Sequence, residues 1–494
     1  MSGQNERETV AGLPRPSGSG ASSVPNVLTK TVWLLCVFAA GAAALLLGSD
    51  GAASLGGVLR ADGLTAVMWL VVTFFSGIVH SYSRRYMQGD ARARKFYADV
   101  FAFTVIVGVL VAANHLALFW LAWLAMGVVM ADLIGYRRGW RQSESAGRLA
   151  LGYFVASSAL LGVGLATLWW STGATTVTGA ASSVGELSGG VAYAAAAALI
   201  LAAMVQSALL PFHRWLLSSM TAPTPASALM HAGFVNGGGV LLVRFAPLLV
   251  ENPGVMAAVL VVGAASAVAG KLMKSVQPDI KRKLGCSTVG QMGFMIAQAG
   301  LGFFSASITH LVLHGFYKAY LFLSSGERVT NRAPGEDEGG VTAAGVAVTV
   351  PTALAGGAVF AALTGKGAHL DSGLVLAVLV VITVLHASLG LTSRKDVPRL
   401  VRFAGVPVVF LPAIAVYGVV YNAVTWAMAD VPFADAPQEL APVHVAVVAV
   451  FLVGYVAVEY DLQTRSERLY TKLMNLSQPS PKTVLTNKEE YKNG

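Results

Sequence analysis

The chain has 494 residues, of which 55% are apolar and only 12% carry a formal charge. A soluble domain carries about 25% charged residues, so this composition excludes an ordinary cytosolic enzyme. The net charge is +9, but the basic residues lie in short clusters between apolar segments. That distribution is typical of membrane-protein loops and argues against nucleic-acid binding.

Apolar segments of about 20 residues recur along the whole chain, and each is long enough to cross a hydrocarbon layer of about 30 Å. We therefore expect an all-α, polytopic membrane protein with about fourteen transmembrane helices. The expected helices lie near residues 31–49, 61–83, 96–112, 115–135, 148–171, 190–220, 222–250, 255–275, 285–301, 306–325, 341–363, 373–392, 404–427 and 441–460.

Positive charge occupies alternate loops between these segments, and the intervening loops are neutral or acidic. The basic clusters lie at residues 84–95, 137–141, 281–283 and 394–399. Because cytoplasmic loops carry an excess of Lys and Arg, we expect both termini in the cytoplasm and the spans in a bacterial inner membrane.

The two ends of the chain are polar. Residues 1–28 are rich in Gly, Ser and Pro, which predicts a disordered cytoplasmic tail before a transmembrane domain over 29–460. Residues 461–494 form the expected C-terminal tail. Its first part, 462–476, has the pattern of an amphipathic helix lying on the membrane surface or on a partner.

The cysteine content is low. Only Cys36 and Cys286 are present, so we expect neither a disulfide framework nor a cysteine-based metal site.

The richest polar segment inside an expected span is 310–318, which reads His-Leu-Val-Leu-His-Gly-Phe-Tyr-Lys. Spacings of four place His310, His314 and Lys318 along one helix face. Ionisable groups at bilayer depth are costly and usually face a cavity or a partner, so the row predicts a proton relay. Histidines bound to backbone carbonyls and a metal pair are the alternatives. The span holds no carboxylate or cysteine, which disfavours a metal.

A second polar region surrounds three prolines. Pro211 interrupts an apolar run, and Pro223 and Pro225 precede His231 in the next span. A proline in a helix interior removes a backbone hydrogen bond, so we expect a broken helix that lines a polar cavity. The glycines at 237–239 are compatible with this role or with a close packing face between helices.

These motifs resemble the antiporter-like subunits of respiratory complex I and of multisubunit cation/proton antiporters. Three stretches carry the similarity, at 210–244, 279–294 and 310–326. It extends back to 80–87 and 114–135, so it covers most of residues 60–330. Within that superfamily, the amino-acid sequence of residues 206–219 and 236–239 most resembles the DabB family, the membrane subunits of DAB inorganic-carbon accumulation complexes.

The resemblance implies two five-helix repeats related by inversion, near 96–250 and 255–427, each with a broken helix. It also implies a chain of polar residues across the membrane middle. The residues that match this chain by position are His231, His310, His314 and Lys318.

The sequence departs from complex I at the coupling ion pair. Leu124 stands where those subunits have a glutamate, and Gln206 stands where they have a lysine. Loss of both charges argues against the proton-pumping mechanism of complex I. It fits a subunit that conducts ions inward to drive a partner subunit.

Five further residues are candidates for the ion pathway. Asp132 lies in the span that has lost the glutamate, and Lys366 stands near the family's terminal lysine. Lys271 and Lys274 are one turn apart and either line the path or extend to the interface. Asp62 opens the second span as an ion entrance or as a helix cap.

The implied function is conduction of protons or sodium ions, coupled to inorganic-carbon uptake. The resemblance places CO2 hydration in a DabA-like zinc protein, similar to β-carbonic anhydrase, on the cytoplasmic face. This chain would then be a transporter subunit without catalytic residues, metal or cofactor of its own. The alternatives are a subunit of a cation/proton antiporter, a proton-pumping subunit of complex I or a hydrogenase, and a structural scaffold.

Overall fold

The computed structural model describes residues 23–48, 52–325, 342–393 and 397–484. Twelve helices in these ranges are long and apolar enough to cross a membrane. The all-α, multi-pass architecture is therefore confirmed, whereas the count of fourteen is not. The segments expected near 285–301 and 306–325 are helical but are not among the twelve, because both carry many polar residues.

Each expected span overlaps at least one observed helix, although α1 and α5 begin seven or eight residues earlier than expected and the spans expected at 190–220 and 222–250 are each divided into several elements. The first half of the chain contains α1 (Ser23–Leu47), β1 (Ala53–Leu55), β2 (Leu59–Ala61), α2 (Gly63–Tyr86), α3 (Ala93–Ala112), α4 (Leu116–Ile134), α5 (Arg141–Thr172), α6 (Val177–Ser182), η1 (Val184–Glu186), α7 (Gly189–Gln206), α8 (Arg214–Ser218), η2 (Ser219–Thr221), α9 (Thr224–Ala232), η3 (Phe234–Asn236), α10 (Gly237–Arg244) and α11 (Ala246–Val250).

The second half continues with longer helices. It contains α12 (Pro253–Val276), α13 (Ile280–Gly300), α14 (Phe304–Leu323), α15 (Ala343–Thr364), α16 (Ser372–Thr392), α17 (Arg399–Ala427), α18 (Pro442–Glu459), α19 (Leu462–Arg465), α20 (Glu467–Leu476) and η5 (Pro481–Thr483).

Local sequence signals set several helix ends. The side chain of Asp279 accepts a hydrogen bond from the backbone N–H of Arg282 at the start of α13, over 2.7 Å. Asp371 caps α16 in the same way. Gly173 ends α5 with a positive φ of 70°, a backbone conformation that favours glycine. Such caps satisfy backbone groups that a helix end leaves unpaired.

The break expected at Pro211 is present. α7 ends at Gln206 and α8 begins only at Arg214, with irregular backbone between them. The hydroxyl of Ser207 donates to the carbonyl of Val235, over 2.8 Å, which ties the break to the short 3-10 helix η3 between α9 and α10. Pro223 and Pro225 lie at the start of α9, where proline is tolerated.

The glycines at 237–239 form a packing face. A Cβ atom on Gly238 would lie 2.3 Å from the Ser207 hydroxyl oxygen and 2.7 Å from the Ala203 carbonyl oxygen. This close approach of α10 to α7 supports the packing interpretation of these glycines.

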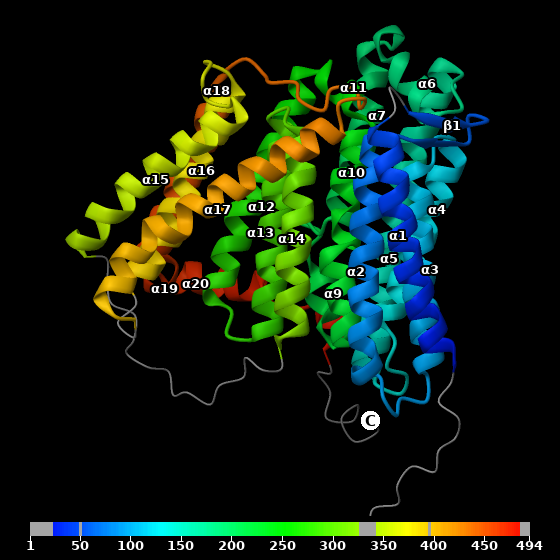
Figure 1. Ribbon diagram of the computed structural model, residues 1–494, viewed down its shortest axis with the longest axis horizontal. Coiled ribbons are helices and arrows are strands. Elements are labelled where there is room, and N and C mark those ends of the chain that lie inside the picture. Colours follow the sequence, from blue (N-terminus) through cyan, green and yellow to red (C-terminus); the bar gives the residue numbers. More distant parts are fainter. Residues whose placement is uncertain (1–22, 49–51, 326–341, 394–396, 485–494) are drawn as a thin grey trace, which may run out of the picture.

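The helices α1 to α5 lie at one end of the molecule, α12 to α14 in the middle, and α15 to α18 at the other end (Figure 1). One large apolar core joins the first group to the middle, and a smaller core joins the middle to the last group. The expected inversion between two repeats remains a prediction.

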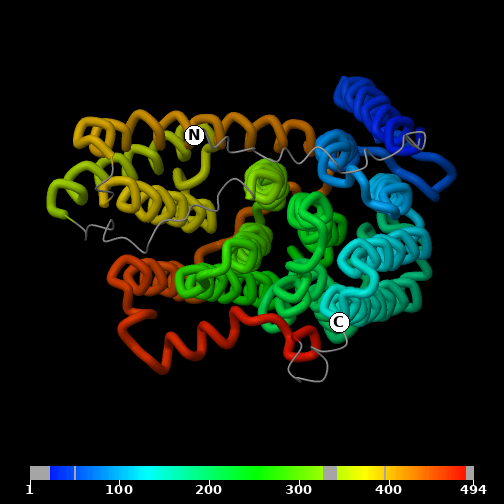
Figure 2. The backbone as a smooth tube through the Cα atoms, turned by 90° about the horizontal axis from the view of Figure 1, so that it is seen from below, coloured from blue at the N-terminus to red at the C-terminus, as the bar shows by residue number. Residues whose placement is uncertain are grey.

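The C-terminal segment crosses one end of the bundle (Figure 2). The helical expectation for 462–476 is confirmed by α19 and α20. The Leu476 carbonyl lies 2.9 Å from Nε2 of His213, and Gln277 donates to the Ser477 carbonyl over 3.1 Å. The segment thus lies against this chain's own broken helix. Residues 23–28 belong to α1 and not to the disordered tail expected over 1–28. Residues 1–22 of that tail, and residues 485–494 of the tail expected over 461–494, lie outside the described residues.

Candidate ion pathway

Three ionisable side chains of α14 form the row that their spacing predicts. The rings of His310 and His314 lie nearly parallel, with centroids 6.1 Å apart. One turn further on, Lys318 is fully buried, and its Nζ donates to the Leu284 carbonyl of α13 over 2.9 Å. The row therefore faces the interior of the helix bundle along α14.

His231 adds a fourth member from another helix. It is fully buried in α9, and its Nδ1 lies 2.9 Å from the hydroxyl oxygen of Thr288 on α13. Its ring stacks on Phe322, with centroids 4.3 Å apart. We use "central row" for His231, Lys318, His314 and His310.

The central row contains polar atoms without protein partners. Among the described residues, Nε2 of His231, Nε2 of His310 and both ring nitrogens of His314 are buried without a hydrogen bond. No described carboxylate lies within ion-pair distance of Lys318. Buried polar groups are rarely left unpaired, so this arrangement is suited to water or a mobile ion.

A cavity of about 470 Å³ adjoins one end of the central row. His310 and His314 form part of one wall, and Lys271, Lys274 and His386 lie on other walls. Since a water molecule occupies about 30 Å³ in the liquid, this space admits on the order of ten waters. Ionisable side chains of α14, α12 and α16 therefore line one half-open cavity, whose remaining lining is largely apolar.

Lys271 does not simply extend to the interface. Its Nζ contacts Nε2 of His386 on α16, and Nδ1 of His386 contacts a carboxylate oxygen of Glu459 on α18. Sequence reasoning missed His386 and Glu459 because they stand alone in separate spans. The available signal was their ionisable character at membrane depth.

Neither position that corresponds to the coupling ion pair of complex I carries a charge in this chain. Gln206 is buried, and its side-chain amide donates weakly to the Phe234 carbonyl over 3.5 Å. Leu124 is partly buried on α4. Any acid–base pair in this chain must therefore lie elsewhere.

Asp62 lies away from the central row, in a closed ion pair with Arg244 at the end of α10. The two side chains are 4% and 9% exposed. Asp62 also caps α2, since its carboxylate accepts from the Thr65 N–H over 3.0 Å. Burial alone would raise the pKa of Asp62, but the charge and hydrogen bonds of Arg244 and the hydrogen bonds from Thr65 outweigh burial and lower it.

Two other candidates also pair away from the row. Asp132 contacts Lys95 at the basic end of the bundle. Lys366 lies 3.1 Å from a carboxylate oxygen of Asp435, at the opposite end. Nine residues were predicted for the pathway. Four form the central row, and Lys271 and Lys274 line the cavity that His310 and His314 also line. Asp62, Asp132 and Lys366 lie apart from this group.

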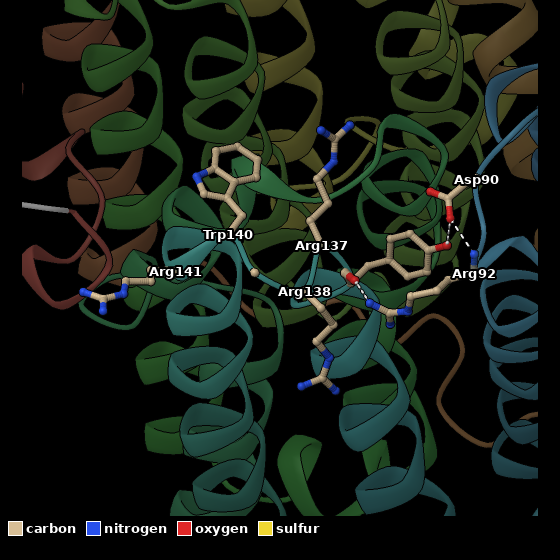
Figure 3. Close-up of a pocket in the computed structure, with 8 residues that line it drawn as sticks. Asp90, Arg92, Arg137, Arg138, Trp140 and Arg141 are labelled. Carbon is tan, nitrogen blue, oxygen red and sulfur yellow. Dashed lines mark hydrogen bonds between the residues drawn. The ribbon is translucent and has the colours of Figure 1, made fainter. Parts of the chain in front are cut away.

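The loop between α4 and α5 forms an open basic pocket of about 750 Å³. Figure 3 shows the guanidinium groups of Arg137, Arg138 and Arg141 pointing away from one another. Arg92 donates to the Tyr136 carbonyl over 2.6 Å, which fixes the pocket's inner wall. The dispersed positive charge is suited to an acidic surface more than to one small anion.

Within the described ranges, no three His, Cys, Asp or Glu side chains come together as a metal site would require. The expectation that this chain holds no metal or cofactor stays a prediction.

A multi-pass helical bundle with a broken helix and a buried His/Lys row defines an antiporter-like membrane subunit. Residues 113–388 match the family described as "NADH:quinone oxidoreductase/Mrp antiporter, TM", and the chain belongs to this family. Residues 51–97 match the N-terminal family of complex I chain 5.

Curated relatives include proteins named as inorganic-carbon transporter subunits. The chain is 37% identical over 280 residues to "Probable inorganic carbon transporter subunit DabB1" of Halothiobacillus neapolitanus, covering 55% of this chain and 50% of that protein. It is 35% identical over 293 residues to DabB of Bacillus subtilis, covering 58% and 57%. The chain thus spans about half the length of these relatives.

Solved structures agree on the fold. The Mrp complex from Dietzia sp. DQ12-45-1b gives a TM-score of 0.57 at 22% identity, covering 92% of this chain and 51% of that one. An archaeal membrane-bound sulfane sulfur reductase gives a TM-score of 0.60 at 15% identity, covering 94% of each chain.

Proposed function

We propose that this chain is the ion-conducting membrane subunit of an inorganic-carbon uptake complex. Protons, or sodium ions, move down their gradient through the chain, and a partner uses that energy. The observation that carries the proposal is the central row, because four buried ionisable side chains lie together, several with unpaired ring nitrogens, and two of them, His310 and His314, line a cavity. Similarity to relatives named DabB supports inorganic carbon as the cargo.

Proton movement is the simpler mechanism for these side chains. A neutral imidazole accepts a proton on one nitrogen and releases another from the second, so His310 and His314 transfer protons through an intervening water. Lys318 and His231 extend the same path toward α9. Absence of the Glu/Lys pair at Leu124 and Gln206 supports a subunit that conducts ions to drive its neighbour.

The partner in this proposal is a DabA-like zinc protein on the cytoplasmic face, where CO2 hydration takes place. The spans lie in a bacterial inner membrane with both termini in the cytoplasm, so the basic pocket faces that partner. Positive charge at Arg137, Arg138 and Arg141 supports docking of an acidic surface there. Replacement of Arg137 and Arg138 by Glu should weaken co-purification of the partner.

The proposed function is tested by growth in ambient air. A bacterium that lacks carbonic anhydrase receives this chain, the zinc partner or both, with and without an uncoupler. Rescue that needs both chains and fails with the uncoupler supports the proposal. Rescue by the partner alone, or rescue that persists with the uncoupler, contradicts it.

A subunit of a multisubunit cation/proton antiporter is the second candidate function. The family match and the Mrp-like fold favour it. Recovered sodium tolerance in an antiporter-deficient strain, without growth rescue in air, would select this alternative.

A further inference from the structure

Three helices contribute one ionisable group each to a continuous contact. Lys271 comes from α12, His386 from α16 and Glu459 from the last turn of α18. His386 bridges the other two, because one of its ring nitrogens contacts the lysine and the other contacts the carboxylate. We use "lateral triad" for these three residues.

The lateral triad lies between a cavity and one end of the bundle. Lys271 and His386 line the cavity that also receives His310 and His314. Glu459 ends α18, and the following helices α19 and α20 pack on α12. The His386 side chain is 30% exposed and that of Glu459 is 12% exposed. The triad therefore shares a cavity with His310 and His314 on one side and lies at the end of α18 on the other.

We propose that the lateral triad is a proton-transfer site that connects the cavity to the end of the bundle. This inference rests on the proposed function, which it deepens by assigning the acid–base groups that Leu124 and Gln206 cannot supply. The geometry requires no movement of a helix, since the imidazole already touches both partners.

The transfer conserves atoms and charge. An N–H bond of the Lys271 ammonium breaks as a proton moves to Nε2 of His386, and the Nδ1–H bond breaks as its proton moves to Glu459. The lysine becomes a neutral amine, the glutamate becomes a carboxylic acid, and the imidazole stays neutral in its other tautomer. Water then reprotonates Lys271 and removes the proton from Glu459, and the ring must rotate so that its remaining N–H again faces Glu459 before the next transfer.

Other titratable groups also face this site. Lys274 lies one turn from Lys271 on α12, and His310 and His314 face the cavity from α14. Tyr317 of α14 and Tyr417 of α17 line the cavity, and the Tyr455 ring of α18 meets His386 edge to face at 6.1 Å. None of these six is a carboxylate, so Glu459 is the proton acceptor at the outer end.

A purely structural contact between three helices is the competing explanation. Well-packed apolar side chains hold helices together at least as well as a buried ionic contact. An ionic contact that only tied the helices would also gain nothing from lining a cavity shared with His310 and His314. The two explanations differ in whether Glu459 exchanges a proton.

The first test is infrared spectroscopy of the purified full chain during a pH titration. We expect a protonated-carboxyl band that disappears in Glu459→Gln and titrates at a different pH in His386→Asn. Glu467→Gln and His369→Asn are matched controls, because both residues are exposed and make no ion pair among those described. A spectrum without a Glu459-dependent band, or one unchanged in His386→Asn, overturns the proposal.

The second test is proton flux into proteoliposomes. Glu459→Gln and His386→Asn should each lower the flux at least tenfold, Glu459→Asp should restore part of it, and both controls should match the wild type. Full flux in both triad variants refutes the triad and leaves the proposed function standing. If the wild type carries no flux, the proposed function fails, and the infrared titration still decides whether the triad exchanges protons.

Discussion

Thr288 determines which ring nitrogen of His231 carries the proton. The Thr288 hydroxyl donates to the Leu284 carbonyl over 3.1 Å, and its oxygen lies 2.9 Å from Nδ1 of His231. A hydroxyl has a single proton, so Nδ1 of His231 must be the donor in that contact. The free lone pair of His231 is therefore on Nε2, which has no partner among the described residues.

Replacement of Thr288 by Val should slow ion conduction. The variant removes the hydrogen-bond acceptor and leaves the buried Nδ1–H of His231 unpaired, at a cost of about 1–3 kcal/mol. We expect a loss of about tenfold in proton flux, because about 1.4 kcal/mol corresponds to a factor of ten. Proteoliposome flux measures this effect, and Thr288→Ser should retain most of the activity. Equal flux in the Val and Ser variants would show that the hydroxyl has no such role.

Asp62 should contribute to stability and not to conduction. Asp62→Asn leaves the Arg244 charge buried and unpaired, which costs about 3 kcal/mol. We expect a lower unfolding temperature in detergent, with unchanged flux per folded molecule. Glu186→Gln, at an exposed position, is the control. Loss of flux without loss of stability would instead support Asp62 as an ion entrance.

The stability contribution of Asp62 should also depend on pH. Its folded-state pKa lies below the ordinary value, so the stabilisation is fully present above about pH 4, the pKa of an unfolded aspartate. It is lost as the pH falls through the folded-state pKa. The difference in unfolding temperature between wild type and Asp62→Asn should therefore shrink on acidification, and a constant difference would argue against the ion pair as its source.

The packing role of Gly238 predicts a sharp contrast between two glycines. Gly238→Ala places a Cβ atom against backbone and hydroxyl atoms of α7, and such overpacking costs about 1–3 kcal/mol. Gly152→Ala, in α5 with open space around its Cβ position, should gain up to about 1 kcal/mol from helix propensity. Thermal unfolding of the two variants tests this contrast. Equal stabilities would mean that α10 can move away from α7 at little cost.

Sequence patterns predicted those parts of the molecule that depend on neighbouring residues. The length of the apolar segments predicted the transmembrane helices, and Pro211 predicted the helix break. The spacing of four residues predicted the row of ionisable side chains on α14. Contacts between distant spans could not be predicted in this way. His386 and Glu459 are 73 residues apart, and neither belongs to a local motif. The partner of Asp62 was unpredictable for the same reason, because Arg244 comes from a span far along the chain.

The central claim is that the central row conducts a cation, and flux through reconstituted vesicles tests it most directly. Proton flux should be measured for the wild type, His314→Ala and Lys318→Met, with the amount of folded protein in the membrane determined for each. Lys318→Met keeps the side-chain volume while removing the charge. We predict that both variants insert normally and lose nearly all flux. Wild-type flux in both variants would contradict the account and return the row to a structural role.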